Sequence, residues 1–298
     1  MILNWFRKER KGPSKTEKSA VGTENVSSIE STIRTLEKYR ELGGDRLMAH
    51  FIEANVLLTI AGIRARTEFF INAPIEGVRR SLGALNRLSP QTRIYFQCEV
   101  EATSLAGTFA TAIYVFNSRG LEHSTQHPPI PEIPRYKAGG TIKASLGVLA
   151  WHRAARKSLR KLFTNDETSD RTDTLIEGFT RGYPWIACLD GASFPRGYGF
   201  EEEAEKRGIV RVKIPHAHLY GGAMPEFDVK KEHISHPDVI KTQKLWDDFL
   251  AQFYDSNWHN KLRTSSEFLD ERNIINQDPD SKYSIARLER QGPLAKDW

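Results

Sequence analysis

The chain has 298 residues and a mass of 33.9 kDa, with 39% hydrophobic and 27% charged residues. This is the composition of an ordinary globular protein, and the presence of only two cysteines excludes a disulfide scaffold. No apolar run approaches the roughly 18 residues that a membrane span needs. The net charge of +5 is modest for this length, but basic and acidic blocks alternate along the chain, so the distribution of charge matters more than its total.

The start of the chain and its cysteines predict its compartment. Positive charge follows the short apolar start at residues 1–8, whereas a secretory signal carries its positive charge first. Cys98 and Cys188 read as buried thiols, and so few cysteines fit a reducing, cytoplasmic compartment. Residues 1–26 are too polar to form a core and predict a mobile tail. The alternative for residues 1–11 is a weak peripheral membrane contact, because apolar side chains share a short helical face beside basic ones.

Three helices are predicted at the start of the first folded segment, residues 27–118. The first carries apolar residues at helical spacing and ends at Gly43–Gly44. The second is expected over residues 45–66, and apolar side chains cover most of its circumference. We therefore expect it to form the buried centre of this segment. The third starts at Pro74, because proline suits the first turn of a helix.

A β-hairpin is predicted after these helices. Residues 94–102 alternate strictly between two faces, which predicts a half-buried strand. Residues 109–116 form an almost wholly apolar run that returns after a turn. The face of the first strand expected to be apolar carries Ile94, Phe96, Cys98 and Val100, and the polar face carries Arg93, Tyr95, Gln97 and Glu99.

A proline-rich connector is predicted at residues 119–140. This stretch holds four prolines and two adjacent glycines, which cannot continue a helix or a strand, so it should run extended. We place the domain boundary there. The alternative is a proline-rich lid or ligand motif, and a plain linker is the favoured interpretation.

The second folded segment is expected over residues 141–260. It opens with a helix over residues 144–163. Residues 184–189 and 209–214 read as two strands joined by a short helix, which predicts a small parallel βαβ unit. Residues 261–298 are polar and weakly periodic, and predict an extended C-terminal tail.

The fold class expected from these elements is α+β. A helical and β-hairpin N-terminal half precedes a small α/β C-terminal half, in a two-domain chain. The last helix of the second half is expected to begin near Pro237, with its inner face formed by Val239, Trp246, Phe249, Leu250 and Phe253.

A candidate metal site follows the predicted strand at residues 209–214. His216 and His218 are two residues apart, so a continuing strand would direct both imidazoles to one side. Asp190 follows the neighbouring predicted strand and would be the third ligand of a divalent metal ion, with zinc as the candidate. Glu226 or Asp228 would then act as the general base. The alternative is that both histidines make ordinary hydrogen bonds, because the pair completes no known metal signature.

A basic stripe is the second candidate. Five cations of the predicted helix over residues 144–163 recur at helical spacing, opposite an apolar face that contains Trp151. Such a stripe would bind nucleic-acid phosphates, an acidic partner or an anionic membrane surface. The alternative is a solvated face that nearby acidic residues neutralise. The stripe consists of Arg153, Arg156, Lys157, Arg160 and Lys161.

Two functions from different classes follow from these candidates. The first is a metal-dependent hydrolase that acts on an anionic substrate, such as a phosphorylated molecule. The second is a non-enzymatic binding protein that docks nucleic acid or an acidic partner on the basic stripe.

Overall fold

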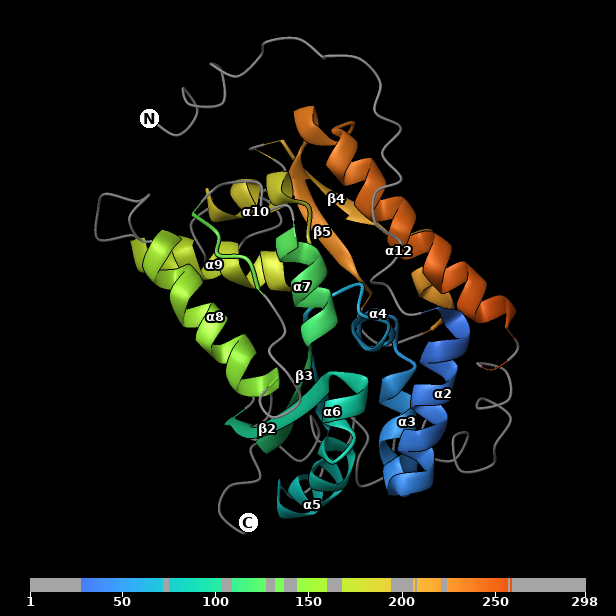
Figure 1. Ribbon diagram of the computed structural model, residues 1–298. Helices are drawn as coiled ribbons and strands as arrows, with labels where there is room; N and C mark the ends of the chain where they lie inside the picture. The colour runs from blue at the N-terminus through green and yellow to red at the C-terminus, as the bar shows by residue number, and fades with distance from the viewer. Residues whose placement is uncertain are drawn as a thin grey trace, which may run out of the picture.

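The computed structural model is shown in Figure 1. The predicted tails, including the membrane contact expected of residues 1–11, lie outside the described residues, as do Arg160 and Lys161 of the basic stripe. The residues that the structure describes are 28–71, 75–102, 109–126, 132–136, 144–159, 168–193, 206, 208–220, 224–256 and 258.

The N-terminal helices surround one buried helix. Helix α2 (Ile29–Tyr39) continues into a short π-helix (Arg40–Gly44), and α3 (Asp45–Phe51) and α4 (Ala54–Ile60) follow. The single helix expected over residues 45–66 is wrong, because Glu53 adopts an extended backbone between α3 and α4. Gly62, with a φ of 78°, then ends the helical segment, since glycine adopts this conformation without strain. The expected buried centre is confirmed for α4.

An antiparallel sheet follows, with the strand order β1-β3-β2. Its strands are β1 (Arg66–Ile71), β2 (Ile94–Ala102) and β3 (Phe109–Asn117). The hairpin of β2 and β3 confirms the sequence prediction. Helices α5 (Ile75–Asn86) and α6 (Ser89–Thr92) connect β1 to β2. One face of the sheet is buried against α4 and its neighbours, and we call the opposite face the outer face.

A group of helices lies beside the outer face. These helices are α7 (Ser118–Gln126), α8 (Ala144–Leu159), α9 (Thr168–Thr180) and α10 (Trp185–Ala192). The strand predicted at residues 184–189 is therefore wrong, because a short apolar run fits a buried helix as well as a strand. The extended course expected of residues 119–140 is also wrong as far as Gln126, where α7 ends. The proposed division of the chain into domains stays a prediction.

The C-terminal elements form a second, smaller sheet covered by a long helix. Strands β4 (Ile209–Lys213) and β5 (Glu226–Lys230) pair antiparallel, so the predicted parallel βαβ unit is wrong. Short 3₁₀ helices, η3 (Pro215–Leu219) and η4 (Lys231–His233), follow these strands. Helix α12 (Pro237–Asp255) buries the five side chains that the sequence predicted for its inner face.

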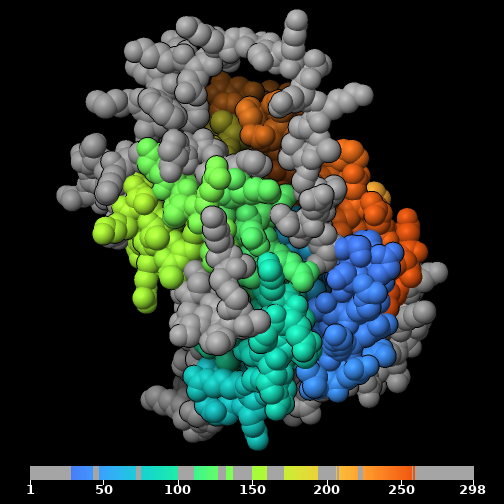
Figure 2. Space-filling model, in the orientation of Figure 1, coloured from blue at the N-terminus to red at the C-terminus, as the bar shows by residue number. Residues whose placement is uncertain are grey.

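Two clusters of buried side chains hold these elements together. The first joins α2, α4 and the inner face of the three-stranded sheet to β4, β5 and α12, so both halves of the chain contribute to it. Figure 2 shows α2 (blue) against α12 (orange) on the surface. The second cluster lies among α7, α8, α9 and α10, and includes Ile133 and Tyr136. The mixture of helices and small antiparallel sheets confirms the α+β class, and no described helix is long and apolar enough to cross a membrane.

Helix α7 approaches the start of β1 so closely that only glycine fits at position 120. A Cβ on Gly120 would lie 2.9 Å from the backbone nitrogen of Ala65, and closer still to the carbonyl of Arg64. Backbone atoms cannot move aside as a flexible side chain can, so we expect Gly120→Ala to lower the free energy of unfolding by about 2 kcal/mol or more.

The matched control for this prediction is Gly83→Ala in α5, where an added Cβ meets no atom within 4 Å. Alanine favours the helix there, so this variant should gain about 0.5–1 kcal/mol. Urea unfolding of both variants measures the two changes. Equal effects at the two positions would contradict the close approach of α7 to β1.

Candidate functional site

The structure separates the two histidines of the predicted metal site. Pro215 begins the 3₁₀ helix η3, in which residues two apart do not face the same side. The His216 ring Nδ1 lies 2.9 Å from Asp247 Oδ1, and the His216 backbone N–H donates to the same oxygen. The His218 ring instead turns back to the carbonyl of Pro215. The expectation that both imidazoles follow a continuing strand is therefore wrong.

Asp190 has partners other than these two histidines. Its side chain is only 4% exposed, and its carboxylate accepts a hydrogen bond from the Lys230 backbone N–H at 2.9 Å. The ring Nδ1 of His233 lies 2.8 Å from the same carboxylate oxygen. Asp190 therefore joins α10 to the end of β5, because its hydrogen bonds satisfy a carboxylate that is buried away from water.

The two predicted general bases form ion pairs across the small sheet. Arg211 on β4 contacts Asp228 through Nε at 3.0 Å and Glu226 at 3.1 Å. Opposite charges on neighbouring strands stabilise their pairing, which is sufficient to explain these residues. Among the described residues, no group of three or more His, Cys, Asp or Glu side chains is arranged to hold a metal ion. The metal site and its general base stay predictions.

The described part of the basic stripe lies on α8 as the sequence predicted. Trp151 is buried on one side of the helix, while Arg153 and Lys157 are exposed on the other. Arg156 is half-buried and donates a hydrogen bond of 2.5 Å to Asp173 on α9. This cation is therefore neutralised within the protein, whereas Arg153 and Lys157 face solvent.

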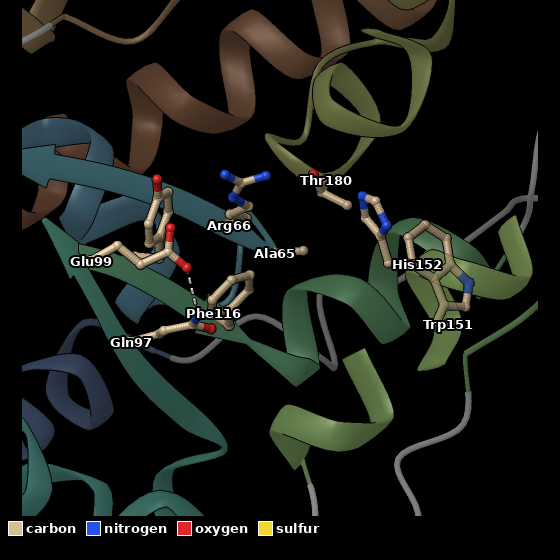
Figure 3. Close-up of a pocket in the computed structure, with 9 residues that line it drawn as sticks. Ala65, Arg66, Gln97, Glu99, Phe116, Trp151, His152 and Thr180 are labelled. Carbon is tan, nitrogen blue, oxygen red and sulfur yellow. Dashed lines mark hydrogen bonds between the residues drawn. The ribbon is translucent and has the colours of Figure 1, made fainter. Parts of the chain in front are cut away.

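A pocket with a volume of about 270 Å³ lies between the outer face of the sheet and helix α8. Its floor comes from alternate residues of the three strands, since successive strand residues face opposite sides. Figure 3 shows Arg66 between Glu99 and Gln97 on one side and Thr180 and His152 on the other. The full lining is Ala65, Arg66, Gln97, Glu99, Tyr114, Phe116, Trp151, His152 and Thr180.

The sheet register and the anchoring of α8 fix the position of this lining. Tyr114 on the central strand pairs with Gln97 on β2, and Phe116 pairs with Arg66 on β1. The Trp151 indole N–H donates to the carbonyl of Pro134 at 2.6 Å, which attaches α8 to the segment before it. The pocket therefore has a floor on the sheet and a wall on α8.

Arg66 is the cation of the pocket. Its guanidinium carbon lies 5.1 Å from the centre of the Tyr114 ring and 5.9 Å from that of Phe116. Aromatic faces attract a guanidinium, so these rings hold it above the sheet. Among the described residues, its hydrogen-bond partner is Glu68, at a long distance of 3.3 Å.

A network of charged residues lies behind Arg66. Arg181 donates to Glu68 and to Glu177, at 2.7 Å in both cases. Glu68 therefore binds Arg181 more closely than it binds Arg66. The carbonyl of Arg181 accepts a hydrogen bond of 2.5 Å from Nε of Arg64. These contacts connect β1 to the end of α9.

Arg64 is a buried cation in this network. Its guanidinium lies 5.1 Å from the Trp246 ring and 5.8 Å from the Tyr183 ring, and it donates to the side chain of Asn55. Burial lowers the pKa of Arg64 to about 10, so the side chain stays charged near pH 7. Aromatic faces and hydrogen bonds stabilise this charge, and the negative charge of Glu68 raises the pKa of Arg64 in opposition to burial.

His152 lines the pocket as a neutral imidazole near pH 7. Burial lowers its pKa below the ordinary value of 6.5, and the positive charge of Arg66 lowers the pKa further. A neutral imidazole accepts or donates a hydrogen bond, whereas Arg66 donates to an anion and Glu99 accepts from a cation. The lining of the pocket therefore offers a guanidinium donor at Arg66, a carboxylate acceptor at Glu99 and a neutral imidazole at His152.

Only part of the lining of this pocket could be predicted from the sequence. Gln97 and Glu99 were predicted on the polar face of their strand, which is the outer face of the sheet. Arg66 was missed because it was assigned to the end of a helix, whereas it is the first residue of β1. His152 was missed because it lies between the buried and exposed faces of α8, where periodicity gives no clear assignment.

The lowered pKa of His152 predicts how the stability of the protein changes with pH. As pH falls below about 6.5, the unfolded chain binds a proton at this residue and the folded protein does not, so stability is lost. Replacement of His152 by glutamine removes this titration. Unfolding by urea at several values between pH 5 and pH 7 should therefore show a smaller loss for His152→Gln than for the wild type. Identical losses would contradict the assignment.

Comparison with known proteins gives no relative from which a function can be taken. No protein-family model, no curated protein and no solved structure matches the chain. Function is therefore inferred from the chain's own residues, and the pocket between the outer face and α8 is the place where their geometry is most informative.

Proposed function

We propose that the protein binds a small anionic molecule in the pocket between the outer face of the sheet and helix α8. The observation that carries this proposal is the small number of hydrogen bonds that Arg66 makes within the described chain. Its guanidinium has several N–H donors, and within the described chain it uses one of them in a long hydrogen bond to Glu68. The remaining donors suit a carboxylate or a phosphate, which guanidinium groups bind with paired hydrogen bonds.

The surroundings of Arg66 support a specific site over a solvated surface arginine. The Arg66 side chain is 24% exposed, so an anion would meet it partly out of water, where charge–charge attraction is stronger. The rings of Tyr114 and Phe116 restrict the guanidinium, which lowers the entropy lost on binding. Trp151 and Phe116 add apolar surface to the lining, so an anion that carries a ring would fit best.

The test of this proposal is binding of phenyl phosphate and benzoate, measured by isothermal titration calorimetry. We expect Arg66→Ala to weaken the binding of both anions about tenfold or more, because a hydrogen bond to a charged group contributes about 1.5–3 kcal/mol. Arg79→Ala is the matched control, since Arg79 forms an exposed ion pair with Glu76 on α5 and does not line the pocket.

Two results would contradict this proposal. One is that neither phenyl phosphate nor benzoate binds to the wild type. The other is an equal loss of affinity in Arg66→Ala and Arg79→Ala, which would point to a general effect of charge. Far-ultraviolet circular dichroism shows whether both variants keep the wild-type fold.

Docking of a polyanion on α8 is the second candidate function. The exposure of Arg153 and Lys157 favours it, because these cations face solvent on the side of α8 opposite the buried Trp151. The pairing of Arg156 with Asp173 reduces the charge that the described part of the stripe offers. Nucleic acid is the polyanion proposed, since cations on one face of a helix can neutralise neighbouring phosphates of a duplex.

A double variant tests this second candidate. Arg153→Glu combined with Lys157→Glu should abolish salt-sensitive binding of a short DNA duplex, measured by fluorescence anisotropy at several salt concentrations. The same variant should keep the wild-type affinity for phenyl phosphate, because neither residue lines the pocket. Wild-type affinity of the variant for the duplex would exclude α8 as the binding surface.

The cytoplasm is the compartment that we propose for either function. Cys98 and Cys188 are both free thiols, and a reducing compartment keeps thiols in this state. The contacts of His216, His218 and Asp190 do not support the predicted metal-dependent hydrolysis, so we propose binding in place of catalysis.

A further inference from the structure

The pocket offers a negative group as well as a positive one. Glu99 lines the same pocket as Arg66. Among the described residues, its carboxylate accepts a hydrogen bond of 2.9 Å from the side-chain amide of Gln97. Arg66 donates to Glu68 on its own strand. The polar partner of each charged side chain therefore lies on its own strand, and Arg66 and Glu99 are not paired with each other. Opposite charges that share a pocket without pairing can each bind part of a ligand.

The register of the sheet places these two charges on either side of one aromatic residue. Tyr114 on the central strand pairs with Glu68 on β1 and with Gln97 on β2. Arg66 lies one pleat from this row in one direction, and Glu99 lies one pleat from it in the other. The Arg66 guanidinium extends over the Tyr114 ring, and Tyr114 belongs to the row of the sheet between the row of Arg66 and the row of Glu99.

The charge balance of the pocket argues against a purely anionic ligand. Arg64, Arg66 and Arg181 are matched by Glu68 and Glu177 behind the pocket and by Glu99 on its lining, so the charges are balanced without a ligand. A ligand that carries only negative charge would bind Arg66 and be repelled by Glu99. A ligand that also carries a cation would satisfy both groups, and such matching is how polar sites obtain specificity.

We infer that the ligand is a zwitterion, with its anionic group at Arg66, its protonated amine at Glu99, and an aromatic or apolar body against Tyr114, Phe116 and Trp151. This inference rests on the proposed function, because it needs the anionic group to bind Arg66. An aromatic amino acid has this combination of groups. A protonated amine near Tyr114 also gains from the attraction between a cation and an aromatic face.

The experiment compares three probes that differ by one group each. L-Phenylalanine carries both charges, 3-phenylpropanoate lacks the amine, and 2-phenylethylamine lacks the carboxylate. Calorimetry on the full-length wild type should give about tenfold tighter binding for phenylalanine than for either other probe, because each charged group adds a charge-assisted hydrogen bond.

Substitution at Glu99 then assigns the amine to its partner. Glu99→Gln should weaken phenylalanine binding about tenfold and leave 3-phenylpropanoate binding unchanged or tighter, since the repulsion is removed. Glu76→Gln is the matched control, because Glu76 is an exposed carboxylate on α5 outside the pocket, and it should leave the affinities for all three probes unchanged.

The outcomes separate this inference from the function on which it rests. Equal affinities of the wild type for phenylalanine and 3-phenylpropanoate, both lost in Arg66→Ala, would overturn the zwitterion and keep the anion site. Binding of phenyl phosphate through Arg66 without binding of phenylalanine would have the same meaning. The absence of Arg66-dependent binding by any of these probes would overturn both.

Discussion

The backbone of Arg64, Ala65 and Arg66 lies where the two buried clusters meet, and the pocket depends on its position. The N–H of Ala65 donates to the carbonyl of Thr180 at the end of α9, and its carbonyl accepts from the N–H of Asn117 at the end of β3. Helix α7 approaches this backbone through Gly120, at a distance that no larger residue allows. The same three residues thus join two helices to the sheet and direct the Arg66 side chain to the outer face.

The three arginines around this junction differ in their burial and in their pairing. Arg64 is buried and is satisfied by aromatic faces and hydrogen bonds, so it serves the packing of α12 and α9 against β1. Arg181 is paired with two carboxylates. Arg66 and Arg181 are both partly exposed, and Arg66 differs in having only a long contact with Glu68, which leaves donors for the anion that we propose it binds. Burial therefore distinguishes Arg64, and pairing distinguishes Arg181, from the arginine that we propose as the binding residue, although all three belong to one network.

Sequence patterns predicted the parts of this fold that local periodicity determines. The alternation of residues 94–102 and the inner face of α12 were both correct, because each element has one buried face. The apolar run at residues 184–189 was assigned to a strand, yet it forms α10, since a fully buried segment has no periodicity to read. The expectation that His216 and His218 continue a strand was wrong for a local reason, because Pro215 starts a 3₁₀ helix. The pocket depends on long-range contacts between β1, α8 and α9, and these contacts are not encoded in any one local pattern.

The location of a bound anion is the most direct test of this account. Nuclear Overhauser effects between the ring protons of phenyl phosphate and the side chains of the labelled protein would give that location. We expect contacts from the ligand ring to Tyr114, Phe116 and Trp151, with the phosphate at Arg66. Contacts confined to the exposed face of α8 around Arg153 and Lys157, or to any surface away from the outer face of the sheet, would contradict it.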